Sequence, residues 1–246
     1  MSDLILPLDV SASELIARLA AHVEPRRLQR MRAVAALRTR HLGARGERFY
    51  DRHTIAACTR TAEALGLQEL HGVPEPGLSE AERRPPRDPT LADSAIDSGR
   101  SVSMAAERWV DRIDHERTTE ALGALREAGH RIAVTAFGDA GELTPVDALP
   151  LDRPLTLIWG NEQRGVSPEA LALADHRVTI PMRGFVPSLN VSVAFAIVMA
   201  RLRDRLEAER APDSWLLTGN EQESLVARWL LAHVPHAAAI LSSRTT

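Results

Sequence analysis

The sequence contains no lysine and only one cysteine, Cys58. A single cysteine excludes an intrachain disulfide framework and a cysteine-rich zinc site. This cysteine usage is typical of a reducing compartment, so we expect a cytoplasmic protein. Since lysine is missing, arginine is the only strongly basic side chain, and any strongly basic anion-binding surface has to be formed by arginines.

Long apolar runs are also missing. No stretch approaches the ~20 apolar residues that span a bilayer, and Met1–Pro7 lacks the basic start and apolar core of a signal peptide. We therefore expect neither a membrane segment nor a secretory leader. No G-x-G-x-x-G turn follows the first expected strand, which disfavours a nicotinamide oxidoreductase. No G-x-S-x-G elbow is present, which disfavours a serine hydrolase.

The distribution of charge is more informative than its total. The net charge of −3 does not indicate a nucleic-acid-binding protein, yet arginines crowd residues 26–48, where Glu47 is the only acidic residue. Such a patch could neutralise RNA phosphates. It could equally be the solvated face of a helix, and the sequence leaves both interpretations open. The arginines are Arg26, Arg27, Arg30, Arg32, Arg38, Arg40, Arg45 and Arg48.

The N-terminal residues and the rest of the chain differ in pattern. The capping sequence Ser11–Glu14 predicts a first helix, and a second is expected over Arg27–His41. Strand-like and helix-like segments then alternate, which predicts an α/β fold with a mostly parallel sheet. We expect strands over 45–50, 69–73, 131–137, 155–159 and 177–182, and helices over 54–65, 104–109, 119–128 and 168–174.

Two further helices are expected near the C-terminus. The segment Val191–Glu209 places apolar residues at i, i+3, i+4 and i+7, which predicts the longest helix of the chain. A last amphipathic helix is expected over Asn220–Val234. Residues 74–94, rich in proline and charge, predict a long exposed loop.

Two strand ends combine glycine with polar residues, in Trp159–Ser167 and Ile180–Ser192. Ligands bind beyond the carboxyl ends of parallel strands, and glycines allow close approach of the backbone to a ligand. Ser188 or Asn190 could cap the long helix and direct its first N–H groups at a pocket. Each signal alone is weak, because the Gly-Asn-Glu of the first segment recurs at Gly219–Glu221, where it is a plain helix start.

The two segments together resemble a known family. Ile158–Val166 and Ile180–Ala194 are similar to the second and third signature motifs of the SPOUT methyltransferases, and Thr54–Gly66 is similar to the first. The spacing resembles the TrmH branch, which methylates ribose 2′-hydroxyls of tRNA and rRNA. The resemblance covers about Arg48–Arg205.

The resemblance implies a fold with a deep trefoil knot, in which the mostly parallel sheet is flanked by helices. It implies a methyltransferase domain at 45–210, an N-terminal helical RNA-binding extension at 1–44 and a C-terminal helical extension at 211–246. It also implies a homodimer and S-adenosylmethionine as cofactor, with no metal. The residues expected to bind the cofactor are Thr135, Gly160, Asn161, Ile180 and Leu189.

The same resemblance implies roles for individual side chains in attack of a 2′-oxygen on the sulfonium methyl group. The expected catalytic residues are Arg60, Glu162, Ser188 and Asn190. The terminal extensions favour tRNA over rRNA, with the D-loop guanosine as target. The residues expected to bind the RNA substrate are Thr54, Arg27, Arg30 and Arg38.

The first motif departs from the family pattern. Thr54 stands where the family has asparagine, and Asp51-Arg52-His53 replaces Asp-Pro-His. The expected strand at 45–50 is charged instead of apolar, and Ala105 replaces a glycine. Two alternatives therefore stay open: a catalytically weak or inactive knotted RNA-binding dimer, and an rRNA 2′-O-methyltransferase. Trp109 and Trp159 are expected in the core.

Overall fold

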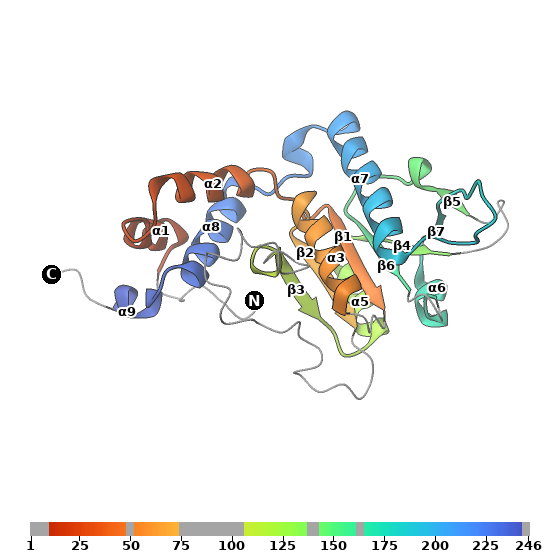
Figure 1. Ribbon diagram of the computed structural model, residues 1–246, viewed down its shortest axis with the longest axis horizontal. Coiled ribbons are helices and arrows are strands. Elements are labelled where there is room, and N and C mark those ends of the chain that lie inside the picture. The colour runs from red at the N-terminus through yellow and green to blue at the C-terminus, as the bar shows by residue number, and fades with distance from the viewer. Residues whose placement is uncertain (1–9, 48–51, 74–105, 137–142, 161–164, 243–246) are drawn as a thin grey trace. The chain divides into compact units, whose positions relative to one another are not determined.

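The computed structural model describes residues 10–47, 52–73, 106–136, 143–160 and 165–242. The contacts between residues divide the chain into two compact units (Figure 1). One unit is residues 40–211, and the other combines residues 1–39 with residues 212–246. The expected loop at 74–94 and Ala105 lie outside the described residues.

The larger unit contains a seven-stranded sheet in the order β3-β2-β1-β6-β4-β7-β5, and every neighbouring pair is parallel. This confirms the predicted α/β fold with a parallel sheet flanked by helices, while the threading of the chain into a knot stays a prediction. The strands are β1 (Leu42–Glu47), β2 (Glu69–Val73), β3 (Asp111–Asp114), β4 (Arg131–Thr135), β5 (Thr144–Pro145), β6 (Leu155–Trp159) and β7 (His176–Thr179).

Helices cover both faces of this sheet. On one face, Ile132, Val134 and Ile158 form a core with side chains of α5 (Thr118–Glu127) and α6 (Pro168–Leu173). On the other face, Trp159 meets Phe195 of α7 (Val191–Glu209), with ring centroids 5.5 Å apart. The helix α3 (Arg52–Ala64) packs beside α7 (Figure 1). Alternation of side chains along parallel strands produces these two layers.

The helix ends in this unit follow local signals. The expected helix over Val191–Glu209 is confirmed, with Asn190 as its N-cap. Gly66, with φ of 75°, follows α3, and Gly129, with φ of 84°, follows α5. Both glycines adopt the left-handed conformation that commonly ends helices. The 3₁₀ turns of this unit are η2 (Ala106–Arg108) and η3 (Val146–Ala148).

The smaller unit is helical and joins both ends of the chain. Helix α1 (Ala12–Ala20) packs against α8 (Gly219–His233) and α9 (Ala237–Ser242), and α2 (Pro25–Ala35) packs against α8. Ser11 caps α1 as expected, and Thr218 and Glu221 form a full capping box at α8. The short turn η4 (Pro212–Ser214) precedes α8. None of the described helices combines the length and apolar character needed to cross a membrane.

Several expected boundaries are wrong. The second helix ends at Ala35 instead of His41, because the next residues bond to a distant segment: the Arg38 carbonyl accepts from Leu217 N–H at 2.9 Å. The first strand begins at Leu42 rather than Arg45. Strands β3 and β5 were not predicted, since β3 has the polar sequence Asp-Arg-Ile-Asp and β5 has only two residues.

Candidate active site

The carboxyl ends of β4, β6 and β7 lie side by side in the sheet. Val134 of β4 is in register with Ile158 of β6, and Thr135 is in register with Val178 of β7. The half-buried Thr135 donates a hydrogen bond from Oγ1 to the Ile158 carbonyl at 3.4 Å. The loops that start at Gly160 and Ile180 therefore leave the sheet at one edge, as expected from the sequence.

Gly160 lies at the tightly packed base of the first loop. A β-carbon at this position would lie 2.0 Å from the Gly165 carbonyl carbon and 2.2 Å from the Val166 nitrogen. No side chain fits there, so glycine is required by the close approach of two backbone segments. Gly165 itself has φ of 64°. Asn161 and Glu162 lie outside the described residues.

The second loop leads into α7. Ile180 and Leu189 are half-buried, and Ser188 and Asn190 are exposed. The Asn190 side chain uses Oδ1 to accept from the N–H and the hydroxyl of Ser192, at 2.9 and 2.7 Å. Its amide NH₂ group is not used by this cap and can donate to a ligand.

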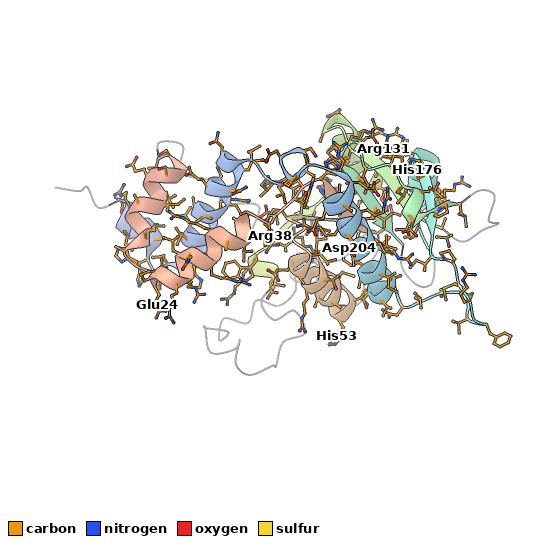
Figure 2. The ribbon with its side chains drawn as sticks, turned by 90° about the horizontal axis from the view of Figure 1, so that it is seen from above. Glu24, Arg38, His53, Arg131, His176 and Asp204 are labelled. Atoms are coloured by element: carbon orange, nitrogen blue, oxygen red, sulfur yellow. The ribbon has the colours of Figure 1, made fainter. Side chains whose placement is uncertain are left out.

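The helix α3 carries the first-motif residues. Thr54 is 7% exposed in its first turn, whereas Arg60 is exposed. Figure 2 shows the labelled His53, also exposed, at the start of α3. Among the described residues the Arg60 guanidinium has no hydrogen-bond or ion-pair partner, so it is available to an anionic ligand.

The opposite edge of the sheet has a structural role. Figure 2 labels Arg131 and His176 at the amino ends of the neighbouring strands β4 and β7. Arg131 is paired with Asp152 at 2.7 Å, and His176 Nδ1 lies 3.4 Å from the Thr144 hydroxyl. Both side chains already have protein partners, which leaves the carboxyl edge as the candidate site.

The arginines of the N-terminal segment fall into different environments. Arg26, Arg30 and Arg32 of α2 are exposed, and Arg27 is half-buried with a guanidinium nitrogen 3.3 Å from His233 Nδ1. Arg38 is fully buried, with its guanidinium carbon 5.6 Å from the Trp229 ring centroid. The expectation that Arg38 binds RNA is therefore wrong, because a cation stacked inside the helical unit does not reach a phosphate.

A buried polar network at the end of β1 was not predicted from the sequence. Glu47, 2% exposed, accepts hydrogen bonds from the Ser167 N–H at 2.8 Å, the Ser167 hydroxyl at 3.1 Å and the Thr118 hydroxyl at 2.6 Å. Arg45 donates to the Thr118 hydroxyl at 3.0 Å and lies 3.5 Å from Glu47. The signal was the i, i+2 spacing of Arg45 and Glu47, which places both on one face of a strand.

Two histidines lie close to this network. His71 Nδ1 and His115 Nε2 are 3.2 Å apart, and their rings are stacked. Burial, together with smaller contributions from the nearby His115, His130 and Arg45, lowers the pKa of His71 to about 4. Burial also lowers the pKa of His115. Both imidazoles are therefore neutral at pH 7, which avoids adding positive charge beside the buried Arg45.

Together these features define a parallel α/β protein with a ligand edge formed by two glycine-containing loops. A model of the SpoU rRNA Methylase family matches residues 47–200. The match covers more than half of the chain, so the protein belongs to the SpoU methylase family. The motifs that suggested this class lie inside the matched segment.

Individual relatives agree with this assignment. The chain is 34% identical over 179 residues to the Escherichia coli K12 tRNA (guanosine(18)-2′-O)-methyltransferase, covering 72% of this chain and 69% of the relative. It is 35% identical over 164 residues to the Thermus thermophilus protein of the same name, covering 66% and 74%. The crystal structure of the Aquifex aeolicus TrmH/SpoU tRNA modifying enzyme superposes with a TM-score of 0.69 at 25% identity, covering 85% and 98%.

Proposed function

We propose that the protein transfers a methyl group from S-adenosylmethionine to a ribose 2′-hydroxyl of tRNA, with the D-loop guanosine as target. The observation that carries this proposal is the convergence of the β4, β6 and β7 ends at one edge, inside the segment matched by the family model. Relatives that match 179 and 164 residues of the chain are named tRNA (guanosine(18)-2′-O)-methyltransferases.

The edge suits a cofactor held by backbone groups. The contact of Gly160 with Gly165 and Val166 brings two main-chain segments together where side chains are excluded. Further main-chain donors and acceptors for the cofactor come from Thr135, Ile180 and Leu189 in our proposal. Asn161 follows Gly160 in the chain and belongs to the same proposed set. When bound, S-adenosylmethionine supplies an activated methyl group, so the protein has to align the 2′-oxygen and assist loss of its proton.

Arg60 has the electrostatic role in this mechanism. An arginine guanidinium keeps its proton in proteins, so Arg60 is a poor general base. An exposed guanidinium can instead bind the phosphate next to the target ribose and stabilise the developing alkoxide. Ser188 and the amide of Asn190 supply neutral hydrogen-bonding groups at the start of α7, and Glu162 of the other loop completes the proposed catalytic set.

The homodimer is supported by an exposed apolar surface next to the second loop. Phe185 is 110% exposed, Val186 is 59% exposed, and Val193 and Ile197 of α7 are 47% and 37% exposed. Val193 and Ile197 are one helical turn apart, so they lie on one side of α7. Exposed large apolar side chains can mark interaction surfaces, and a second copy of this chain covers them in our proposal.

RNA binding by the terminal extensions is the remaining part of the proposal. The terminal segments, residues 1–39 and 212–246, form one compact unit, and residues 40–211 form the other. Arg30, with Arg26 and Arg32, faces solvent on α2, while Arg27 is partly enclosed. Exposed arginines of this kind bind phosphates without sequence preference. In our proposal this helical unit binds tRNA in preference to rRNA. The reaction takes place in the cytoplasm.

A direct assay tests the proposed function. The full chain is incubated with unmodified tRNA, or with rRNA, and methyl-labelled S-adenosylmethionine, and the methylated ribose is mapped. We expect label at the D-loop guanosine of tRNA. The Arg60→Ala variant should lose activity by a factor of a hundred or more while calorimetry still detects cofactor binding. Label in rRNA alone would contradict the tRNA assignment, and unchanged activity in Arg60→Ala would contradict the mechanism.

A catalytically weak RNA-binding dimer is the second candidate, and Thr54 is the observation that favours it. The side chain at this position is buried, and its hydroxyl cannot reproduce the paired donor and acceptor of the family's asparagine. Binding of tRNA and cofactor without turnover in the same assay would support this alternative.

A further inference from the structure

Glu47 connects elements that are far apart in the sequence. It is the last residue of β1, and its carboxylate accepts hydrogen bonds from Thr118 at the start of α5 and from both the N–H and hydroxyl of Ser167. A carboxylate offers about four acceptor positions, so this side chain is nearly saturated by protein donors. It is therefore a structural acceptor and not a free catalytic group.

Ser167 is the point at which the Gly160 loop ends. The residues just before it, Gly165 and Val166, form the tight contact with Gly160. The Ser167 hydroxyl donates to Glu47 at 3.1 Å and accepts from the Ala170 N–H at 3.2 Å, which caps α6. One serine thus joins the exit of the loop to β1 and to α6.

Glu47 is also connected to the first motif through the chain itself. The strand β1 ends at Glu47, and α3, with Thr54 and Arg60, begins at Arg52. The residue that contacts the end of the Gly160 loop therefore also ends the strand that precedes α3 in the chain. A shift of β1 relative to this loop would move both the proposed substrate residues and the proposed cofactor residues.

The charge of Glu47 is matched by a buried arginine. Arg45 is 0% exposed, and its Nε and Nη1 have no hydrogen-bond partner within the described part of the chain. The cation is compensated only by Glu47 at 3.5 Å and by the Thr118 hydroxyl, among the residues that the structure describes. A buried ion pair contributes little net stability, but removing one partner leaves an uncompensated buried charge.

We propose that Glu47 is a positioning residue that fixes the exit of the Gly160 loop, through Ser167, in the geometry that binds S-adenosylmethionine. The inference rests on the proposed function, because that function assigns the cofactor to this loop. Glu47 touches neither cofactor nor substrate in this proposal and acts only through Ser167.

The first test compares two substitutions of equal size. Ser167→Thr keeps the hydroxyl, whereas Ser167→Val replaces it with a methyl group in the same shape. Isothermal titration of the full-length protein with S-adenosylmethionine measures the dissociation constant. We expect Ser167→Thr to stay within threefold of the unsubstituted protein and Ser167→Val to bind at least tenfold more weakly.

A matched control separates positioning from loss of stability. Thr218→Val removes the same kind of N-cap from α8, in the other unit of the chain. It should lower the melting temperature about as much as Ser167→Val while leaving the cofactor dissociation constant unchanged. An equal loss of cofactor affinity in Thr218→Val would reduce the Ser167 effect to general destabilisation and overturn the proposal.

A double variant tests Glu47 itself. Arg45→Met with Glu47→Leu removes both buried charges together with the acceptor for Ser167, so no uncompensated ion is left. We expect this variant to bind cofactor at least tenfold more weakly, and Ser167→Val to have no further effect in that background, because both changes break one connection. Additive losses would overturn the proposal, as would tight binding by both the double variant and Ser167→Val.

The same titration distinguishes this proposal from the proposed function. If the unsubstituted protein does not bind S-adenosylmethionine, the assignment of the cofactor is wrong. If the unsubstituted protein binds S-adenosylmethionine, and Ser167→Val and Ser167→Thr have equal dissociation constants for it, the cofactor assignment stands and the proposed role of Glu47 is wrong.

Discussion

The two halves of the sheet are stabilised in different ways. In the half formed by β6, β4 and β7, every residue of β6 is buried, and Ile132, Val134 and Ile158 pack against apolar side chains of α5 and α6. In the half formed by β3, β2 and β1, the buried positions include Arg45, Glu47, His71 and Asp111. Central strands of a parallel sheet are usually apolar, so the second half is the unusual one.

The two halves therefore use different interactions to fix the positions of functional residues. Apolar burial is non-directional, and it tolerates changes that keep volume. A buried hydrogen-bonded network is directional, and the loss of one member leaves others unsatisfied. The proposed cofactor loops leave the apolar half, whereas the first-motif helix follows the polar strand β1. The departures of this chain from the family pattern are concentrated in that polar half.

The largest expected effect is in the polar half. Glu47→Leu leaves the buried Arg45 without its counter-charge, and we expect it to lower the free energy of unfolding by about 3–5 kcal/mol. Urea denaturation measures this change. In the double variant Arg45→Met with Glu47→Leu, no buried charge remains from this pair. Most of the loss in the free energy of unfolding should then be recovered. A single variant as stable as the double one would show that the two halves do not differ in this way.

The apolar half should be most sensitive to added volume at Gly160. The Gly160→Ala β-carbon would lie 2.0 Å from the Gly165 backbone. We expect a loss of about 1–3 kcal/mol in the free energy of unfolding, together with loss of cofactor binding, measured by denaturation and calorimetry. Gly123→Ala on α5 is the control, because nothing lies within 4 Å of its β-carbon and the change should stabilise the helix.

The pH dependence of stability tests the buried histidines. The folded protein keeps His71 neutral to about pH 4, whereas the unfolded chain takes up a proton below the ordinary pKa of 6.5. The unfolded state binds more protons in this interval, so the contribution of His71 is complete above pH 6.5 and falls as the pH drops toward 4. Between pH 6.5 and 5 the loss should be about 2 kcal/mol.

The variant His71→Gln should flatten this slope when urea denaturation is compared at pH 7 and 5. His130, which precedes β4 in the apolar half, serves as the comparison, because burial also lowers its pKa to about 4. His130→Gln should remove a similar contribution. An unchanged slope in His71→Gln would show that this imidazole is accessible to protons in the folded state.

The smallest expected effect concerns the first motif. Thr54→Asn restores the donor and acceptor pair of the family, and one additional hydrogen bond contributes about 0.5–1.5 kcal/mol. We expect kcat/KM for tRNA to rise by roughly 3–10-fold, as measured by initial rates, with cofactor affinity unchanged. Thr54→Val, which has no polar group, should not raise the rate. A rise in both variants would assign the effect to packing.

Predictability from the sequence also differs between the two halves. Apolar periodicity was sufficient to locate β4, β6 and α7, because their side chains are selected for burial in one layer. It was insufficient for β3, whose polar residues Asp111 and Arg112 resemble a loop. Arg38 was expected to bind RNA, since a single sequence does not show that Trp229, far along the chain, covers this guanidinium.

The candidate site was predictable to the extent that it depends on local sequence. The glycines and the cap at Asn190 are local features, so the two loops could be located from the residues alone. The contacts of Glu47 with Thr118 and Ser167 join residues 71 and 120 positions apart. No local pattern specifies such a pairing, and it requires the register of the folded sheet.

The sequence by itself determined the α/β class, the family motifs and the long helix after Asn190, because each follows from side-chain periodicity or backbone preference within a few residues. Only the tertiary structure decided which charged residues are buried and which are free to bind a ligand. Burial depends on what the rest of the chain places over a side chain, so Arg38 and Arg45 became interior groups while Arg30 and Arg60 stayed at the surface.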